Sequence, residues 1–184
     1  MNADPFSRKY FATTLSAFPL LLASEISTSL ISILGLVLLL MTSALISGSE
    51  VALFGLNAQD MQWIKAQETK PSERVLRLLE SPKKLLATIL IANNAVNIAI
   101  VLLFTSMSDR WFAGSEFYFF ERISLQTLID IAIATVLILL FGEILPKIYA
   151  NRNAASFSLR MSMVLTVLDR LFSVLSVPMQ SSTV

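Results

Sequence analysis

The sequence predicts an all-α membrane protein with three transmembrane helices and amphipathic helices along the membrane surface. The first reason is composition: mean hydropathy is +0.70 and only 15% of the 184 residues are charged, whereas soluble domains carry about a quarter. The second reason is three largely apolar windows of 24 residues, 26–49, 85–108 and 123–146. About 20 apolar residues suffice to cross a bilayer.

The three spans are expected at about residues 28–49, 85–107 and 124–146. Lys and Arg are concentrated in the segment 50–84 and after the third span, while the connector before the third span has only Arg110 and Arg122. Because cytoplasmic loops are enriched in Lys and Arg, we expect the N-terminus outside and the C-terminus in the cytoplasm.

Two segments outside the spans predict amphipathic helices on the cytoplasmic side. In the first, at about 57–82, Pro71 and Pro82 each mark the start of a helix. In the second, at about 153–177, apolar residues recur at spacings of three and four. A helix along the inner membrane surface fits the second pattern, and a fourth span is the alternative.

Residues 1–25 form an N-terminal leader that has two open interpretations. Arg8 and Lys9 precede an apolar stretch, which is typical of a signal peptide. Asp4 and Pro5 fit that pattern poorly. An interfacial or loosely packed leader is therefore the favoured interpretation.

The composition also excludes several classes of function. The chain contains no cysteine and no histidine, which excludes disulfides, thiol catalysis, Ser–His catalysis and the usual ligands of zinc. Its net charge is +1 and it has no basic stripe with interleaved aromatics, so we expect no nucleic-acid partner. We do not expect an enzyme, and any metal site must be built from oxygen ligands.

Each predicted span carries polar residues, although an unsatisfied polar group in the membrane interior costs several kcal/mol. These residues are Ser43, Ser47, Ser49 and Glu50 in the first span, Asn93, Asn94 and Asn97 in the second, and Glu143 in the third. Hydroxyl, amide and carboxylate oxygens suit a hard cation such as Mg²⁺. We expect an oxygen-lined cation site between the helices.

Helical spacing indicates which of these groups point together. Asn93 and Asn97 lie four residues apart and therefore share one face of the second span. Ser43 and Ser47 have the same relation in the first span. Asn94 is rotated by roughly 100° from Asn93, so its amide is offset from the shared face.

Helix kinks are expected beside two of the polar clusters. Gly48 follows Ser47, and Gly142 precedes Glu143. Pro146 lacks an amide hydrogen and clashes with the carbonyl four residues earlier. Broken helices that line a central ion site recur in transporters, which favours a site at these positions.

Each polar residue also has a purely structural interpretation. Serines at four-residue spacing often only pack helices together, and membrane asparagines often hydrogen-bond between helices. Glu143 has Lys147 one turn later as a partner, and Glu50 and Asp130 are expected near the membrane interfaces. Polar clusters on all three spans, two of them beside expected kinks, favour a shared site.

Three motifs, ISGSEVALFGL, ATILIANNAVNIAIV and FGEILPKIYANRNA, resemble the transmembrane domain of the CorC/cyclin M (CNNM) family of magnesium transporters. The resemblance covers about residues 36–177, most of the chain. The phrases ILIANN and LPKIYANRNA look most like a gliding-motility-associated bacterial branch of this family.

The resemblance implies a homodimer of three-span protomers in the bacterial inner membrane, with a cytoplasmic belt helix and residues 26–184 as the domain. It implies Na⁺-coupled export of Mg²⁺. The implied ligands are Ser47, Asn93, Asn97 and Glu143. Secondary candidates for the site or a Na⁺ pathway are Ser43, Asn94 and Glu50, and Pro146 is the implied kink. CBS and corC-type domains do not appear before Val184, so we expect no nucleotide site.

Two other functions remain as alternatives. The first is a non-transporting scaffold that keeps the fold and binds other membrane proteins or lipoproteins of a motility or secretion complex. The second is an intramembrane hydrolase that uses Ser47 or Ser49 with Lys147. The absence of histidine and of a nucleophile elbow disfavours the hydrolase.

Overall fold

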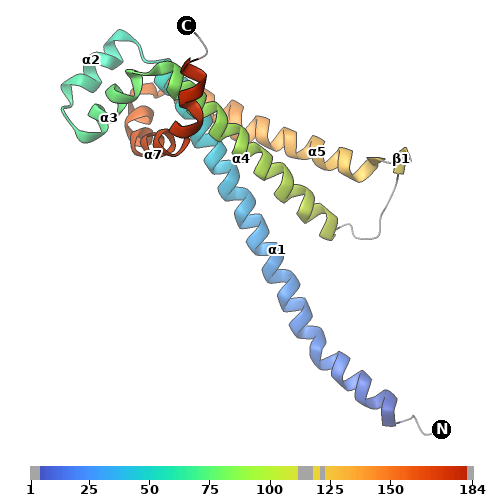
Figure 1. The fold of residues 1–184 in the computed structure, drawn as a ribbon. Helices are drawn as coiled ribbons and strands as arrows, with labels where there is room; N and C mark the ends of the chain where they lie inside the picture. The colour runs from blue at the N-terminus through green and yellow to red at the C-terminus, as the bar shows by residue number, and fades with distance from the viewer. Residues whose placement is uncertain (1–4, 112–117, 121–122, 182–184) are drawn as a thin grey trace. The chain divides into compact units, whose positions relative to one another are not determined.

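The computed structural model describes residues 5–111, 118–120 and 123–181, with side chains for 27–111 and 125–172 (Figure 1). Its elements in chain order are α1 (Pro5–Phe54), α2 (Ala58–Ala66), α3 (Lys70–Leu79), α4 (Pro82–Trp111), β1 (Tyr118–Phe120), β2 (Ile123–Ser124), α5 (Leu125–Leu137), the π-helix η1 (Ile138–Ile144), α6 (Leu145–Arg152) and α7 (Ala154–Ser181). The expected helical fold is confirmed, with one small hairpin added.

The chain divides into two compact units, residues 1–37 and 38–184. The first unit contributes the beginning of α1, which starts at Pro5 and includes most of the expected leader. The second unit contains the end of α1, every other element and the buried core. All the contacts that build the candidate site lie within this second unit.

Three helical stretches are long and apolar enough to cross a membrane: Ser27–Phe54, Pro82–Trp111 and Leu125–Arg152. The number of candidate spans therefore agrees with the sequence, and α7 is not among them within the described residues. The first and third stretches are longer than the sequence predicted: the first continues beyond Glu50 and the third beyond Pro146. Large apolar side chains such as Leu30, Ile98 and Val136 are more than half exposed, as lipid-facing positions are expected to be.

The third span changes its helical type instead of ending at the proline. The Leu145 amide donates to the Leu140 carbonyl, five residues back, and η1 separates α5 from α6. Pro146 lies in the first turn of α6, where its missing amide hydrogen costs little. The segment in which a kink was expected thus contains a π-helix, which includes Gly142 and ends before Pro146. Such helices are frequent at functional sites.

At Gly48, the other position where a kink was expected, the structure shows a continuous helix and a close contact with another helix. α1 is α-helical without interruption from Pro5 to Phe54. A Cβ atom at Gly48 would lie 2.9 Å from Cζ of Phe157 on α7. The glycine therefore permits close packing between α1 and α7 rather than a break in α1.

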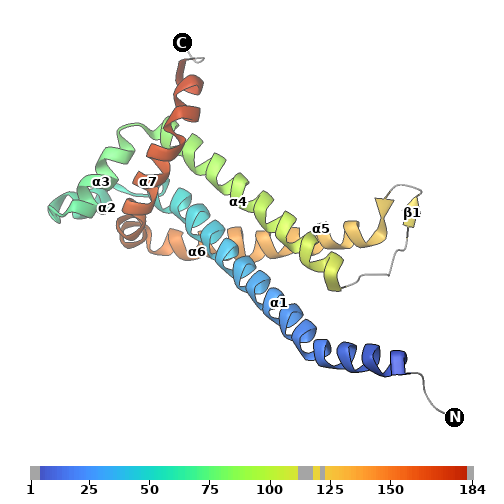
Figure 2. The same cartoon turned by 60° about the horizontal axis from the view of Figure 1, so that its bottom comes forward.

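The helices α2, α3 and α7 gather at one end of α4 (Figures 1 and 2). Capping boxes start the two short helices, with Asn57 and Asp60 at α2 and Thr69 and Ser72 at α3. Pro71 lies in the first turn of α3, and α4 begins at Pro82, as the prolines predicted. The buried core joins these elements through Ile46, Leu53, Ile64, Val75, Leu78, Leu85, Ile89, Ala92, Met161 and Leu165.

A two-stranded antiparallel hairpin between α4 and α5 was not predicted. Tyr118 pairs with Ser124, and Phe120 pairs with Ile123. Aromatic and β-branched residues favour extended backbone, but strands this short give too weak a pattern to recognise in a sequence.

Candidate cation site

Polar side chains of all three spans form one connected cluster. The Ser43 hydroxyl lies 2.8 Å from Asn97 Oδ1 and 3.3 Å from Asn93 Oδ1. A hydroxyl has a single proton, so it donates to one asparagine at a time, and the shorter contact is the stronger. Asn97 Nδ2 donates to Glu143 Oε1 at 3.3 Å. We call Ser43, Asn93, Asn97 and Glu143 the polar cluster.

Gly142 permits the close approach of the third span to Ser43. A Cβ atom at position 142 would lie 2.9 Å from Ser43 Oγ and 3.4 Å from Ser43 Cβ. Any larger residue would therefore collide with the hydroxyl that contacts both asparagines. The π-helix carries Gly142 and Glu143 together, so one irregular segment provides both the contact surface and the carboxylate.

Ser47 lies one helical turn after Ser43 and is fully buried. Its Oγ has no hydrogen-bond partner among the described residues. Buried polar groups in native structures nearly always have a partner, so this hydroxyl is available to a ligand. Ser49 differs, since its hydroxyl donates to the Leu45 carbonyl of its own helix at 2.6 Å.

The alternative pairing of Glu143 with Lys147 is not present. Lys147 Nζ lies 3.4 Å from Glu50 Oε2 instead, and both side chains are more than a third exposed. This ion pair occupies Glu50, and an exposed pair contributes little to stability. Lys147, the lysine named for the hydrolase alternative, is therefore engaged with a carboxylate.

Asn94 is exposed on α4 and lies outside the polar cluster, as the helical spacing predicted. With Asn97, it lines a pocket of about 350 Å³ whose other walls are Ile98, Val101, Leu102 and Ile138. Asn97 thus links this pocket to the polar cluster.

Asp130 is buried, with 4% of its surface exposed, although the sequence placed it near an interface without a role. The Ser108 hydroxyl donates to Asp130 Oδ1 at 2.6 Å, and Oδ2 has no partner in the described part of the chain. The pair joins α4 to α5. The sequence did show that Ser108 and Asp130 are polar residues within apolar windows. However, serines are common near the ends of spans, so this pattern could not identify the two residues as partners.

Replacing Ser108 by alanine is expected to destabilise the protein. The change leaves the buried Asp130 carboxyl without its shortest hydrogen bond, and such a loss costs about 1–3 kcal/mol. Thermal unfolding in detergent measures the effect. Ser106→Ala, at an exposed position of the same helix, is the control, and equal melting temperatures for both variants would contradict the structural role of the pair.

The ligand set is chemically consistent with a hard cation. It offers two amide oxygens, two serine hydroxyls if Ser47 is included, and one carboxylate. Among the described residues no group of three or more His, Cys, Asp or Glu side chains gathers, so a site rich in carboxylates or soft ligands does not occur there. Oxygen ligands suit Mg²⁺, Ca²⁺ and Mn²⁺.

The fold and this cluster define a three-span membrane domain with an oxygen-lined polar centre. The profile of the cyclin M transmembrane N-terminal domain matches residues 34–183. The chain therefore belongs to the cyclin M family, as the resemblance of its motifs implied.

Curated relatives agree with this family. A UPF0053 protein of Haemophilus influenzae is 34% identical over 137 residues, 74% of this chain and 30% of the relative. The UPF0053 inner membrane protein YfjD of Escherichia coli is 32% identical over 108 residues, 59% of this chain and 23% of the relative. The metal transporter cnnm-4 of Caenorhabditis elegans is 30% identical over 131 residues, 68% of this chain and 26% of the relative. The chain thus spans less than a third of each relative's length.

Proposed function

We propose that this chain is a metal-transport domain that holds a dehydrated Mg²⁺ ion between its three spans. The observation that carries this proposal is the polar cluster, in which three hydrogen-bonding contacts connect one serine, two asparagines and one glutamate from three helices. The name of the cnnm-4 relative, a metal transporter, supports a metal ion as cargo. The oxygen-only ligand set supports Mg²⁺.

In this proposal, the ion replaces hydrogen bonds that the ligands make with one another. Asn97 Oδ1 now accepts from Ser43, and Asn97 Nδ2 donates to Glu143. Binding directs Asn93 Oδ1, Asn97 Oδ1 and a Glu143 oxygen to the cation instead. Glu143 supplies the negative charge that offsets part of the cost of holding a cation away from water.

Both serines of the first span belong to the proposed ligand set. The family resemblance implied Ser47 as the ligand and Ser43 as a secondary candidate. Ser43 is the serine that contacts the two asparagines, which supports a direct role. Ser47, buried with an unpartnered hydroxyl in the described structure, supplies a further oxygen one turn away.

The direction of transport, the coupling ion and the membrane orientation that we propose are those that the family resemblance and the charge pattern imply. We propose export of Mg²⁺ coupled to Na⁺, across a bacterial inner membrane, with the N-terminus outside and the C-terminus in the cytoplasm. The inner-membrane relative YfjD supports this location, and the concentration of basic residues in segment 50–84 supports this orientation. Loading Mg²⁺ on one side of reconstituted vesicles and varying Na⁺ on the other tests the coupling.

We also propose a homodimer. Asn94 is exposed on a span, and an amide facing lipid is costly. A second copy that covers the pocket lined by Asn94 and Ile98 removes this cost.

The dimer is testable because the chain has no cysteine, so Asn94→Cys introduces a single thiol. Oxidation in membranes is expected to yield a disulfide-linked dimer on a denaturing gel. Thr135→Cys, exposed on a different span, is expected to remain monomeric. Absence of the dimer band in Asn94→Cys, or equal bands in both variants, would contradict this interface.

Transport is tested by reconstituting the chain into lipid vesicles that enclose a fluorescent Mg²⁺ indicator. We expect Mg²⁺ entry that exceeds the leak of protein-free vesicles and that depends on the polar cluster. Flux at the level of the leak would overturn the proposal for this chain.

A membrane scaffold in the gliding-motility-associated branch is the second candidate. The specific observation in its favour is that members of the polar cluster hydrogen-bond to one another, as residues of a purely structural network do. Such a scaffold binds other membrane proteins or lipoproteins. Stable co-purification with a membrane partner, together with no Mg²⁺ flux and no Mg²⁺ binding, would favour it over transport.

A further inference from the structure

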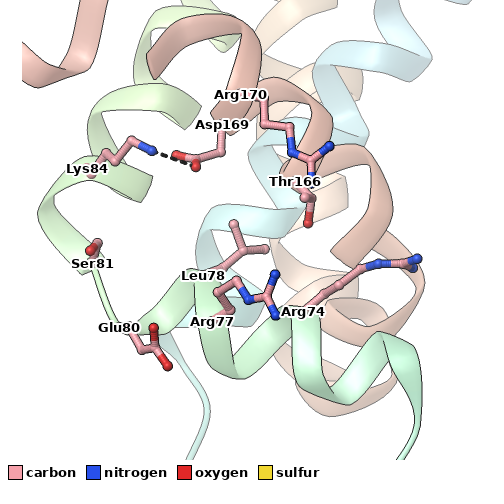
Figure 3. A pocket seen from close by; sticks show the side chains of 9 residues that line it. All are labelled: Arg74, Arg77, Leu78, Glu80, Ser81, Lys84, Thr166, Asp169 and Arg170. Carbon is pink, nitrogen blue, oxygen red and sulfur yellow. Dashed lines mark hydrogen bonds and ion pairs between the residues drawn. The ribbon is translucent and has the colours of Figure 1, made fainter. Parts of the chain in front are cut away.

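A second pocket, of about 330 Å³, lies where α3, α4 and α7 meet, and no residue of the polar cluster lines it (Figure 3). Its charged lining residues are Arg74, Arg77 and Glu80 near α3, Lys84 on α4, and Asp169 and Arg170 on α7. The lining therefore has an excess of two positive charges. The uncharged residues Leu78, Ser81 and Thr166 complete the lining that Figure 3 shows.

One of the two carboxylates in this pocket is already engaged. Lys84 Nζ donates to Asp169 Oδ2 at 2.7 Å, and the Thr88 hydroxyl lies 3.5 Å from Asp169 Oδ1. This contact fixes the wall formed by α4 and α7. Neither Arg74 nor Arg77 forms an ion pair with a carboxylate among the side chains that the structure describes. Their guanidinium groups are available to an anion.

The pocket lies beside the start of the second candidate span. The second span begins at Pro82, and Lys84, in its first turn, belongs to the pocket wall. Basic pockets at the ends of transmembrane helices bind the phosphates of lipid head groups. The planar guanidinium fork of arginine matches two phosphate oxygens at once.

We propose that this pocket binds a phosphate-bearing anion, and that the anion is the head group of an anionic phospholipid in the adjoining leaflet. Arg74 and Arg77 of α3 contact the phosphate oxygens, and the Lys84–Asp169 pair maintains the opposite wall. The volume lies at the lower end of the range for small-molecule sites, which fits a head group. A bound lipid connects α3 to α7 and stabilises their packing.

The test uses the full chain in detergent, titrated with dioleoylphosphatidylglycerol or, for comparison, with zwitterionic dioleoylphosphatidylcholine. Native mass spectrometry counts the bound lipids, and thermal unfolding reports the stabilisation. Phosphatidylglycerol is expected to bind saturably at one molecule per protomer and to raise the melting temperature. The double variant Arg74→Gln/Arg77→Gln is expected to weaken this binding at least about tenfold.

A charge-matched control is the double variant Lys83→Gln/Arg160→Gln, which removes two exposed cations outside the pocket lining. It is expected to change the affinity less than about twofold. Arg77→Lys keeps the charge but loses the fork, so it is expected to weaken binding by an intermediate amount. This single variant also keeps the test valid if the arginine double variant does not fold.

A separate titration with inorganic phosphate, without added lipid, distinguishes the two sources of phosphate. Stabilisation by phosphate alone, with no effect of phosphatidylglycerol, would overturn the lipid assignment and assign a soluble phosphate compound. Equal losses in the two double variants would show attraction to general surface charge and overturn the pocket. Lack of response to both ligands would overturn the proposal entirely.

Discussion

Glu143→Gln is expected to reduce Mg²⁺ transport by a hundredfold or more while the protein remains folded. Glutamine keeps the size of the side chain and an oxygen that accepts from Asn97, so the hydrogen bond of 3.3 Å is retained. It removes the only carboxylate of the polar cluster. Removing one partner of a buried charge pair costs about 3–5 kcal/mol, and about 1.4 kcal/mol corresponds to a tenfold change.

Mg²⁺ entry into reconstituted vesicles measures this effect, and the melting temperature in detergent shows that the variant is folded. Glu50→Gln is the matched control, because Glu50 is more than a third exposed and pairs with Lys147. We expect a small effect there, as for other exposed ion pairs. Normal flux in Glu143→Gln, or equal losses in both variants, would exclude Glu143 as the ligand that balances the ion's charge.

Gly142→Ala is expected to weaken Mg²⁺ binding by at least about tenfold, because it displaces the Ser43 hydroxyl. The displacement removes a hydrogen bond worth roughly 1 kcal/mol and also one ligand of the ion. The added Cβ would lie 2.9 Å from Ser43 Oγ. Rotation of this hydroxyl relieves the contact but breaks its approach to Asn93 and Asn97. Titration calorimetry of the purified protein with Mg²⁺ measures the affinity.

Gly48→Ala provides a control in which the added Cβ atom would approach its nearest neighbour equally closely. Its Cβ would lie 2.9 Å from the ring edge of Phe157, outside the polar cluster, so we expect an effect on stability and little effect on Mg²⁺ affinity. Combining Gly142→Ala with Ser43→Ala should cost little more than either change alone, because both act through one hydroxyl. Fully additive losses would show that Gly142 acts by another route.

The three spans were predictable because an apolar run of about 20 residues has few alternatives to crossing a membrane. The ends of the spans were less predictable. Glu50 and Pro146 suggested boundaries, but the first helix continues to Phe54 and the third to Arg152. A carboxylate with Lys147 as partner is tolerated near a span end, and a proline is tolerated once a π-helix has altered the hydrogen-bond pattern before it.

Within the site, periodicity predicted the shared face of Asn93 and Asn97, because both lie on one helix. Contacts between helices depend on how far one helix is shifted along its axis relative to its neighbour, and the periodicity of a sequence does not give this shift. The family resemblance implied Ser43 only as a secondary candidate, although it is the serine in contact with both asparagines. The burial of Asp130 against Ser108 was missed because this contact also joins two helices. Gly142 was predicted to lie at a helix kink, but its role as a contact surface for Ser43 required the structure.

The most direct test of the shared cation site is a crystal structure of the protein soaked with Mn²⁺, which binds oxygen ligands as Mg²⁺ does and gives an anomalous signal. We predict a single strong peak among Ser43, Asn93, Asn97 and Glu143, with side-chain oxygens at coordination distances of roughly 2.1–2.6 Å. A peak elsewhere, or no peak while Asn97 still donates to Glu143, would contradict the account.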